Sequence, residues 1–219
     1  MLSPKEHLAY LVELAAEPGA SERRELLREL GELLTTWPAN YPIEARSSFA
    51  ALLARVEHDV DPENRRALAN KLARCPDAPL GLLNEFFFDV PADARVEILR
   101  RDSQISAPPD TTGIDEETII QAARTKRGAE FASALATAFG IDQVTASEIL
   151  QDGSGLGLAI ACHGAGFSRA AYSTLAILTT RDEAQIEQRL AAFDAVPDRG
   201  GIAMLSFWRN QARVHAHAA

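Results

Sequence analysis

The sequence predicts an all-α protein built of helical hairpins. Apolar residues recur at spacings of three and four along nearly the whole chain, whereas the period-two alternation of a β-strand is almost absent. Ala and Leu supply most of the 47% apolar content and aromatic residues only 6%, which also favours helices. These patterns predict about a dozen short helices joined by short connections.

The apolar face of individual helices can be followed along the chain. One face comprises Leu26, Leu30, Leu33 and Leu34, the next Phe49, Leu52, Leu53 and Val56, and a later one Phe131, Leu135 and Phe139. Residues that commonly cap helix N-termini precede the predicted helices at Ser21, Asp61, Asp115, Ser168 and Asp182. Glycines suited to the left-handed position just beyond a helix stand at Gly19, Gly128, Gly140 and Gly164.

One connection is longer than the others. Residues 102–113, DSQISAPPDTTG, combine two adjacent prolines with Ser, Thr and Gly and show no periodicity. We expect a boundary there, with helical repeats in residues 1–101, a linker at residues 102–113 and a C-terminal helical domain in residues 114–219.

A repeat is visible in the first half. Two segments share one pattern: DPENRRALANKLARC, which begins at Asp61, and DVPADARVEILRRD, which begins at Asp89. Each opens with Asp and Pro, continues with Arg, and has apolar residues at helical spacing. Their prolines, Pro62 and Pro91, lie 29 residues apart. A period of about 20 to 50 residues is typical of stacked helix pairs. The alternative is that the two segments are alike only because each begins a helix, since proline is common in the first helical turn.

The first of these segments resembles the second helix of a HEAT-type repeat. In that pattern Asp caps the helix, Arg bridges repeats, and Ala and Leu pack between them; the matching residues are Asp61, Pro62, Arg65, Arg66, Ala67, Ala69 and Leu72. The whole chain, from LARCPDAPLGLLNEF through GLGLAIACHGAGFSRAAYSTLAIL to FWRNQA, is similar to a bacterial family of helical-repeat proteins of unknown function. The resemblance implies helical hairpins stacked as a HEAT-like α-solenoid in two halves. It implies no activity for this chain, because the family has no established chemistry.

Composition narrows the classes of partner. The 22 basic and 31 acidic residues give a formal net charge of −9, and such a chain repels a phosphate backbone unless its basic residues cluster, so nucleic acid is disfavoured. Cys75 and Cys162 lack disulfide or zinc spacing, and the pair His215 and His217 does not close a metal site. No segment has the apolar length of a membrane span or the character of a signal peptide. We expect a cytoplasmic protein without membrane contact, metal or cofactor.

The segment DGSGLGLAIACHGAG, residues 152–166, is similar to the ATP-lid glycine box of sensor histidine kinases. In such a lid, the glycines close over the triphosphate and the next helix offers its N-terminal N–H groups. The other half of the site is missing, because the nearest Asp-x-Gly-x-Gly imitation begins at Asp110 and has Thr112 in place of its first glycine. We therefore interpret the box as the boundary between two helices, where Ser154 caps the second helix and the glycines permit a close contact between helices.

His163 suggests a different signalling chemistry. Phosphotransfer domains carry a helical histidine followed by glycine and a small residue, which the segment CHGAGFS imitates. A phosphorylated imidazole needs exposure in mid-helix, whereas Gly164 and Gly166 end this helix at once, and the helix dipole explains a histidine in a last turn. We expect His163 and Cys162 to be packing residues.

The leading hypothesis is a non-enzymatic scaffold or adaptor that binds another protein in bacterial signalling or regulation. Repeat stacks present extended surfaces, and no catalytic arrangement is assembled in the sequence. Three consecutive phenylalanines cannot all face one side of a helix, so at least one is expected to meet a neighbouring repeat or a partner. The proposed contact residues are Phe86, Phe88, Arg65, Arg66 and Trp208. Self-association is compatible with this pattern.

Two alternatives stay open. The first is an enzyme on a HEAT-like scaffold that acts on nucleic acid, as DNA glycosylases do, which requires basic pairs such as Lys126-Arg127 to gather on one face. The second is a phosphotransfer or nucleotide-binding module that uses His163 or the Gly153–Gly157 box.

Overall fold

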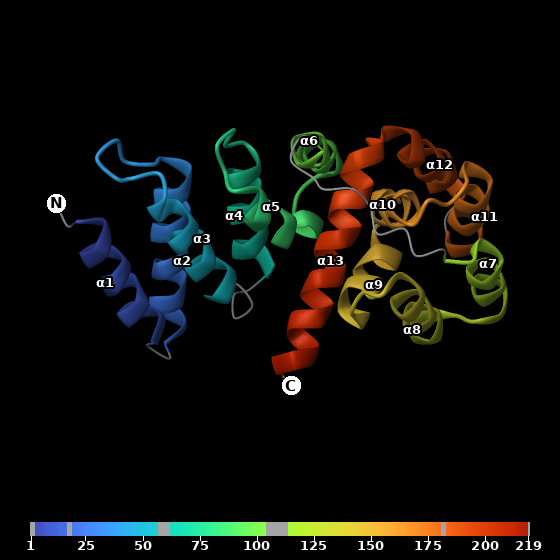
Figure 1. The fold of residues 1–219 in the computed structure, drawn as a ribbon, viewed down its shortest axis with the longest axis horizontal. Coiled ribbons are helices and arrows are strands. Elements are labelled where there is room, and N and C mark those ends of the chain that lie inside the picture. The colour runs from blue at the N-terminus through green and yellow to red at the C-terminus, as the bar shows by residue number, and fades with distance from the viewer. Residues whose placement is uncertain (1–2, 17–18, 57–61, 104–113, 181–182, 219) are drawn as a thin grey trace. The chain divides into compact units, whose positions relative to one another are not determined.

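The chain is helical throughout the computed structural model, which describes residues 3–16, 19–56, 62–103, 114–180 and 183–218 (Figure 1). No strand occurs among these residues, so the predicted all-α class is confirmed. The chain divides into two compact units, residues 1–95 and 96–219. Of the predicted linker, Asp102 is the last residue of a helix, and residues 104–113 lie outside the described ranges. The boundary predicted at this segment therefore stays a prediction.

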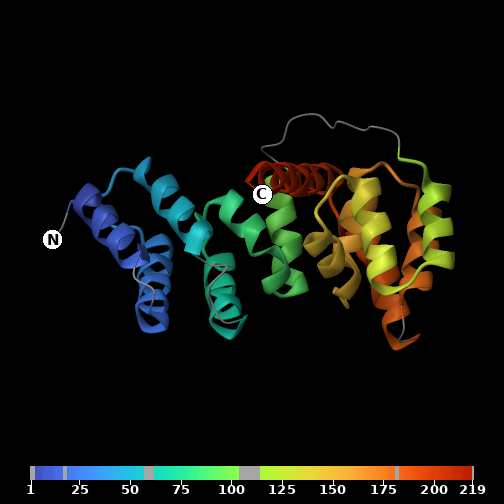
Figure 2. The same cartoon turned by 90° about the horizontal axis from the view of Figure 1, so that it is seen from below.

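The first unit is a succession of short helices whose predicted leucine faces form its core. It contains α1 (Pro4–Ala16), α2 (Ala20–Thr35), α3 (Ala45–Val56), α4 (Pro62–Ala73), α5 (Leu80–Glu85) and the 3-10 turn η2 (Phe87–Asp89). Helix α2 packs against α1, α3 and α4, and α5 packs against α3 and α4. Figure 2 shows the same helices from below, in blue to green. Leu26, Leu30 and Leu34 of α2 are fully buried, as are Phe49 and Leu53 of α3.

The second unit is built around one apolar helix. It contains most of α6 (Ala92–Asp102), then α7 (Glu116–Thr125), α8 (Gly128–Phe139), α9 (Gln143–Gln151), α10 (Leu156–Gly164), α11 (Arg169–Thr179), the 3-10 turn η3 (Glu183–Gln185), α12 (Ile186–Ala195) and α13 (Asp198–Ala218). Helix α10 packs against α9, α11, α12 and α13. Every residue of α10 except His163 is buried, because small and apolar side chains occupy all sides of this helix.

Glycine lets α10 and α13 approach each other closely. A Cβ atom on Gly164 would lie 2.6 Å from the Cβ of Leu205 and 2.8 Å from the carbonyl oxygen of Gly201. The prediction of Gly164 as a left-handed residue beyond the helix was wrong, because Gly164 is the last residue of α10. The left-handed residue is Gly166, with φ of 74°. Gly164 serves packing, since the backbone of α13 leaves no room for a side chain.

Three other predicted helix ends are confirmed. Asp115 caps α7 by accepting hydrogen bonds from the backbone N–H groups of Glu117 and Thr118. Ser168 caps α11 in the same way through the N–H of Ala171. Gly140 ends α8 in the left-handed conformation, with φ of 69°.

Three further predictions of helix ends were wrong or displaced. Ser21 is no cap, because α2 already begins at Ala20, and Gly19 before it is extended, with φ of −72°. Gly128 has a positive φ of 53°, but it opens α8 instead of following a helix directly. Asp61 and Asp182, also predicted as caps, lie outside the described residues.

Candidate functional site

Two of the predicted contact residues, Arg65 and Phe86, lie together in the first unit. Arg65 Nε donates a hydrogen bond to Asp89 Oδ2 at 2.6 Å, and the guanidinium lies over the Phe86 ring, 5.3 Å from its centroid. Asp89 opens the second copy of the sequence repeat, so this ion pair joins one copy to the start of the next. Phe86 and Phe87 are fully buried, whereas Phe88 is partly exposed.

The other two predicted contact residues have different surroundings. Arg66 is exposed on α4. Trp208 belongs to α13 in the second unit and is only 2% exposed. The five residues therefore belong to both units, and their role in binding a partner stays a prediction.

A groove lies between α2 and α4 of the first unit. Its volume is about 360 Å³, and its apolar lining consists of Leu27, Ala67 and Leu68. Three basic residues, Arg24, Arg28 and Lys71, complete the lining together with Gly31 and Asn64, and no described residue of the lining is acidic. The two helices approach closely at Gly31, where a Cβ atom would lie 2.5 Å from Leu68 Cδ1.

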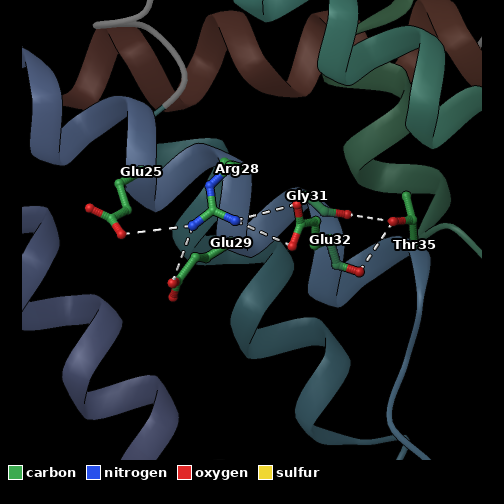
Figure 3. Close-up of polar contacts among 6 residues, drawn as sticks. All are labelled: Glu25, Arg28, Glu29, Gly31, Glu32 and Thr35. Carbon is green, nitrogen blue, oxygen red and sulfur yellow. Dashed lines mark hydrogen bonds and ion pairs between the residues drawn. The ribbon is translucent and has the colours of Figure 1, made fainter.

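The three cations of this groove differ in how their charge is balanced. Arg28 is surrounded by glutamates of its own helix: its guanidinium nitrogens lie 3.7 Å from Glu25 Oε1, 3.6 Å from Glu29 Oε1 and 3.4 Å from Glu32 Oε1 (Figure 3). Within the part of the chain that the structure describes, Arg24 and Lys71 make no ion pair, and both are exposed. These two side chains therefore supply the uncompensated positive charge of the groove.

The second unit contains a larger cavity of about 760 Å³. It lies between the α7–α8 connection, the C-terminal ends of α9 and α11, and the beginning of α12. Its basic lining residues are Lys126, Arg127 and Arg189, and Asp152 is the acidic one. Phe131, Leu150 and Leu178 give it an apolar side.

Arg189 is the buried cation of this cavity, with 3% of its surface exposed. Its Nη1 donates to Thr180 Oγ1 at 2.9 Å, whereas Nε and Nη2 have no hydrogen-bond partner among the described residues. Burial lowers the pKa of the guanidinium because it disfavours the charged form, and Tyr172 and Asp152 act in the opposite direction. The hydroxyl of Tyr172 donates to the backbone carbonyl of Arg189 and so holds α12 in place.

Sequence reasoning missed Arg189, although a signal for it exists. Arg189 precedes Ala192 by three residues and Phe193 by four, and both of these are buried in α12. That spacing places the arginine on the buried face of the helix. A buried arginine is rare unless it is paired, so its position is a sign of a site.

The hydroxyl groups of the cavity are not activated as nucleophiles. Ser147, Thr179 and Thr180 each donate to a backbone carbonyl four residues earlier in the chain. Within the described ranges none of the three bonds to an imidazole or a carboxylate, which a nucleophilic hydroxyl needs as its base.

The glycine box begins a helix, as the sequence indicated. Ser154 Oγ accepts from the N–H of Leu156 at 3.2 Å, and Asp152 Oδ2 accepts from the N–H of Gly157 at 2.9 Å. Ser154 was predicted to cap this helix, but the N-cap residue is Gly155; Ser154 and Asp152, which precede it, accept these two hydrogen bonds from the first turn. Gly155, with φ of 74°, permits the close contact between α10 and α12, since its Cβ would lie 3.0 Å from the Cβ of Arg189. The first N–H groups of α10, which a phosphate at this box would require, are engaged within the protein.

His163 and Cys162 lie where packing residues are expected. The His163 ring stacks on Phe193 with 4.0 Å between centroids, and its Nε2 lies 2.9 Å from the Phe193 carbonyl oxygen. Because a carbonyl only accepts, Nε2 is the protonated nitrogen. The His163 side chain is 15% exposed. Cys162 is fully buried, and this burial raises the pKa of its thiol, with a smaller contribution from Glu116.

These features define an all-helical protein with a basic-rimmed groove in one unit and an arginine-lined cavity in the other. No helix of the described ranges combines the length and apolar character needed to cross a membrane. Residues 45–205 match the family described as "Uncharacterised protein conserved in bacteria (DUF2336)", and the chain belongs to this family. The predicted membership of a bacterial family of unknown function is thereby confirmed. No curated protein and no solved structure matches the chain.

Proposed function

We propose that this chain is a non-enzymatic helical adaptor that binds another protein through the groove between α2 and α4. The observation that carries the proposal is the lining of the groove, which combines an apolar floor with the uncompensated cations Arg24 and Lys71 and, among the described residues, contains no acidic one. Grooves between helices accept the apolar face of an amphipathic helix. Acidic residues beside that face would meet the two cations, so the expected partner presents an acidic amphipathic helix.

The proposal includes a HEAT-like stacking of the first unit, which two observations support. In the HEAT-type pattern an arginine bridges neighbouring repeats, and the ion pair between Arg65 and Asp89 joins the two copies of the sequence repeat. Ala69 and Leu72, which the pattern places between repeats, are fully buried. Repeat stacks of this kind commonly bind other proteins through extended surfaces.

The non-enzymatic part of the proposal is supported by the positions of the reactive groups. His163 is stacked and mostly buried, the N–H groups of Leu156 and Gly157 are engaged, and none of the cavity hydroxyls bonds to a base among the described residues. We place the adaptor in the bacterial cytoplasm and in signalling or regulation. Among the described residues Cys75 and Cys162 form no disulfide, which suits a reducing compartment.

Site-specific photo-crosslinking in the native bacterium tests where the partner binds. A photo-reactive residue in place of Asn64, which lines the groove, is expected to capture the partner. The same residue in place of Glu13, which is exposed on α1, serves as the control. Capture of the same protein with equal yield at both positions would contradict the groove as the binding site.

Affinity measurements with the captured partner then test the charges. Arg24→Ala and Lys71→Ala are each expected to weaken binding about three- to tenfold, because each removes an attraction to the acidic helix. Arg28→Ala should have a smaller effect, since three glutamates already balance Arg28. Lys5→Ala, which removes an exposed lysine from α1, is the matched control. Unchanged affinity in both Arg24→Ala and Lys71→Ala would refute the proposal.

A further inference from the structure

The groove between α2 and α4 runs along the two helices and not across them. On each helix the lining residues occupy positions i, i+3, i+4 and i+7, which lie on one face of an α-helix. They are Arg24, Leu27, Arg28 and Gly31 on α2, and Asn64, Ala67, Leu68 and Lys71 on α4. The two helices pack against each other and run in the same direction (Figure 1), so these two faces lie side by side.

The two uncompensated cations lie at opposite ends of this groove. Gly31 and Leu68 mark the same level of the two helices, because a Cβ atom on Gly31 would lie 2.5 Å from Leu68 Cδ1. Arg24 precedes Gly31 by seven residues, and Lys71 follows Leu68 by three. With a rise of about 1.5 Å per residue, Arg24 and Lys71 are therefore about 15 Å apart along the groove. Lys71 also lines a hollow together with Thr36 at the C-terminal end of α2, which agrees with this placement.

The middle of the groove offers little charge to a partner. Leu27 and Leu68 lie between the two ends and are only 7% and 9% exposed. Arg28 lies there too, but three glutamates of its own helix balance its charge (Figure 3). An acidic side chain at this level would gain little from Arg28 and would be repelled by the glutamates. Because the leucines expose little apolar surface, we expect the charges at the two ends to decide which helices bind.

A helix that lies along the groove can reach both ends with one line of side chains. Positions i, i+4, i+7 and i+11 lie on one face of an α-helix, and about 16 Å separates i from i+11 along its axis. This separation matches that of Arg24 and Lys71. Positions i+4 and i+7 then lie over the apolar middle of the groove.

We propose that the partner helix carries acidic side chains at positions i and i+11 and apolar side chains at i+4 and i+7. One acidic side chain pairs with Arg24 and the other with Lys71. This inference rests on the function proposed for the groove, and it adds the spacing that distinguishes the partner from other acidic amphipathic helices.

Fluorescence anisotropy of two labelled peptides, titrated with the full chain at low salt, tests this spacing. Both are alanine-based helices of about 20 residues, and circular dichroism checks that they are equally helical. The end-acid peptide has Glu at i and i+11 and Leu at i+4 and i+7, whereas the centre-acid peptide has the Glu and Leu residues exchanged. Composition, net charge and the face that carries the side chains are the same in both. The end-acid peptide is expected to bind at least about fivefold more tightly.

Double-mutant cycles assign each end of the peptide to one cation. Arg24→Ala and Lys71→Ala are each expected to weaken binding of the end-acid peptide about three- to tenfold. Replacing one peptide Glu by Gln should abolish the effect of one of these variants and leave that of the other, because each cation contacts a different end. Lys5→Ala, which removes an exposed lysine from α1, is the matched control and should change the affinity less than about twofold.

Three results would overturn the inference. Equal affinities of the two peptides would reject the spacing; if Arg24→Ala and Lys71→Ala still weaken both peptides, the groove remains a site for acidic helices. Abolition of both variants' effects by removal of the same Glu would show that the two cations share one acidic side chain. Absence of saturable binding of the end-acid peptide up to about 1 mM would also reject the inference, and the function proposed for the groove would then be decided by capture at the Asn64 position.

Discussion

Replacing Gly164 by alanine is expected to destabilise the second unit strongly. The new Cβ would lie 2.6 Å from Leu205 Cβ and 2.8 Å from the Gly201 carbonyl oxygen, so α10 and α13 must separate by about 1 Å to restore van der Waals contact. Overpacking of this kind typically costs about 1–3 kcal/mol, and the upper end applies because one contact is with backbone. Alanine regains about 0.5–1 kcal/mol of helix propensity. The free energy of unfolding should therefore fall by about 2 kcal/mol.

Urea unfolding followed by the fluorescence of Trp208 measures this change where it occurs, because Trp208 is buried in the second unit. The Trp37→Phe background removes the tryptophan of the first unit from the signal. The control is Gly81→Ala in α5 of the first unit, where an added Cβ would meet nothing within 4 Å, and its unfolding is followed by the fluorescence of Trp37 in a protein that retains this tryptophan. That substitution should raise stability slightly, by about 0.5–1 kcal/mol, because only the helix propensity changes.

The two substitutions are chemically identical, so their difference isolates the steric effect. A Gly164→Ala protein as stable as the parent would refute the reasoning, since it would show that α10 and α13 separate without cost. A thermal midpoint lowered by about 6–12 °C would agree with the expected loss.

Four further predictions concern the same unit. Burial raises the pKa of both Cys162 and Tyr172, so the stability that each neutral group contributes is complete below its unfolded pKa and is lost as the pH rises above it. The free energy of unfolding should fall by about 1.4 kcal/mol per pH unit above about pH 8.5, where Cys162 begins to contribute, and more steeply above about pH 10, where Tyr172 does so too. Measured by urea unfolding, Cys162→Ala should not show the loss that begins at about pH 8.5. Tyr172→Phe should not show the additional loss above about pH 10. His163→Gln should lower stability by about 1 kcal/mol, and neither it nor the parent should take up acid-labile phosphate from a phosphorylated donor; uptake by the parent alone would establish a phosphoacceptor. Gly155→Ala, at a positive φ and against Arg189, should destabilise by about 1–3 kcal/mol, whereas Gly153→Ala should be neutral. ATP should bind the parent and Gly153→Ala alike with a Kd of about 1 mM or weaker, and micromolar binding lost on substitution would identify a nucleotide site.

The helices and many of their ends could be predicted because their causes are local. The spacing of Leu26, Leu30 and Leu34 reports the buried face of α2 without knowledge of its neighbours. Asp115 and Ser168 cap the helices that follow them through hydrogen bonds that span two or three residues. The prediction for Gly164 failed because this glycine serves a contact with the distant helix α13.

The candidate sites could not be predicted, because each is made by residues far apart in the chain. Arg24 and Lys71 become neighbours in one groove only when α2 packs on α4. Lys126 and Arg189 line the same cavity only because the helices from α7 to α12 pack together.

By itself the sequence determined that this protein is all-helical, where most helices lie, and that it resembles a bacterial family of unknown function. These properties follow from hydrophobic periodicity and from capping, which act over at most a few residues. Only the tertiary structure decided that Arg189 is buried, with two donors unpaired among the described residues, and that Arg24 and Lys71 share a groove. Burial and the gathering of charge depend on which helices pack together, and packing is a property of the whole unit.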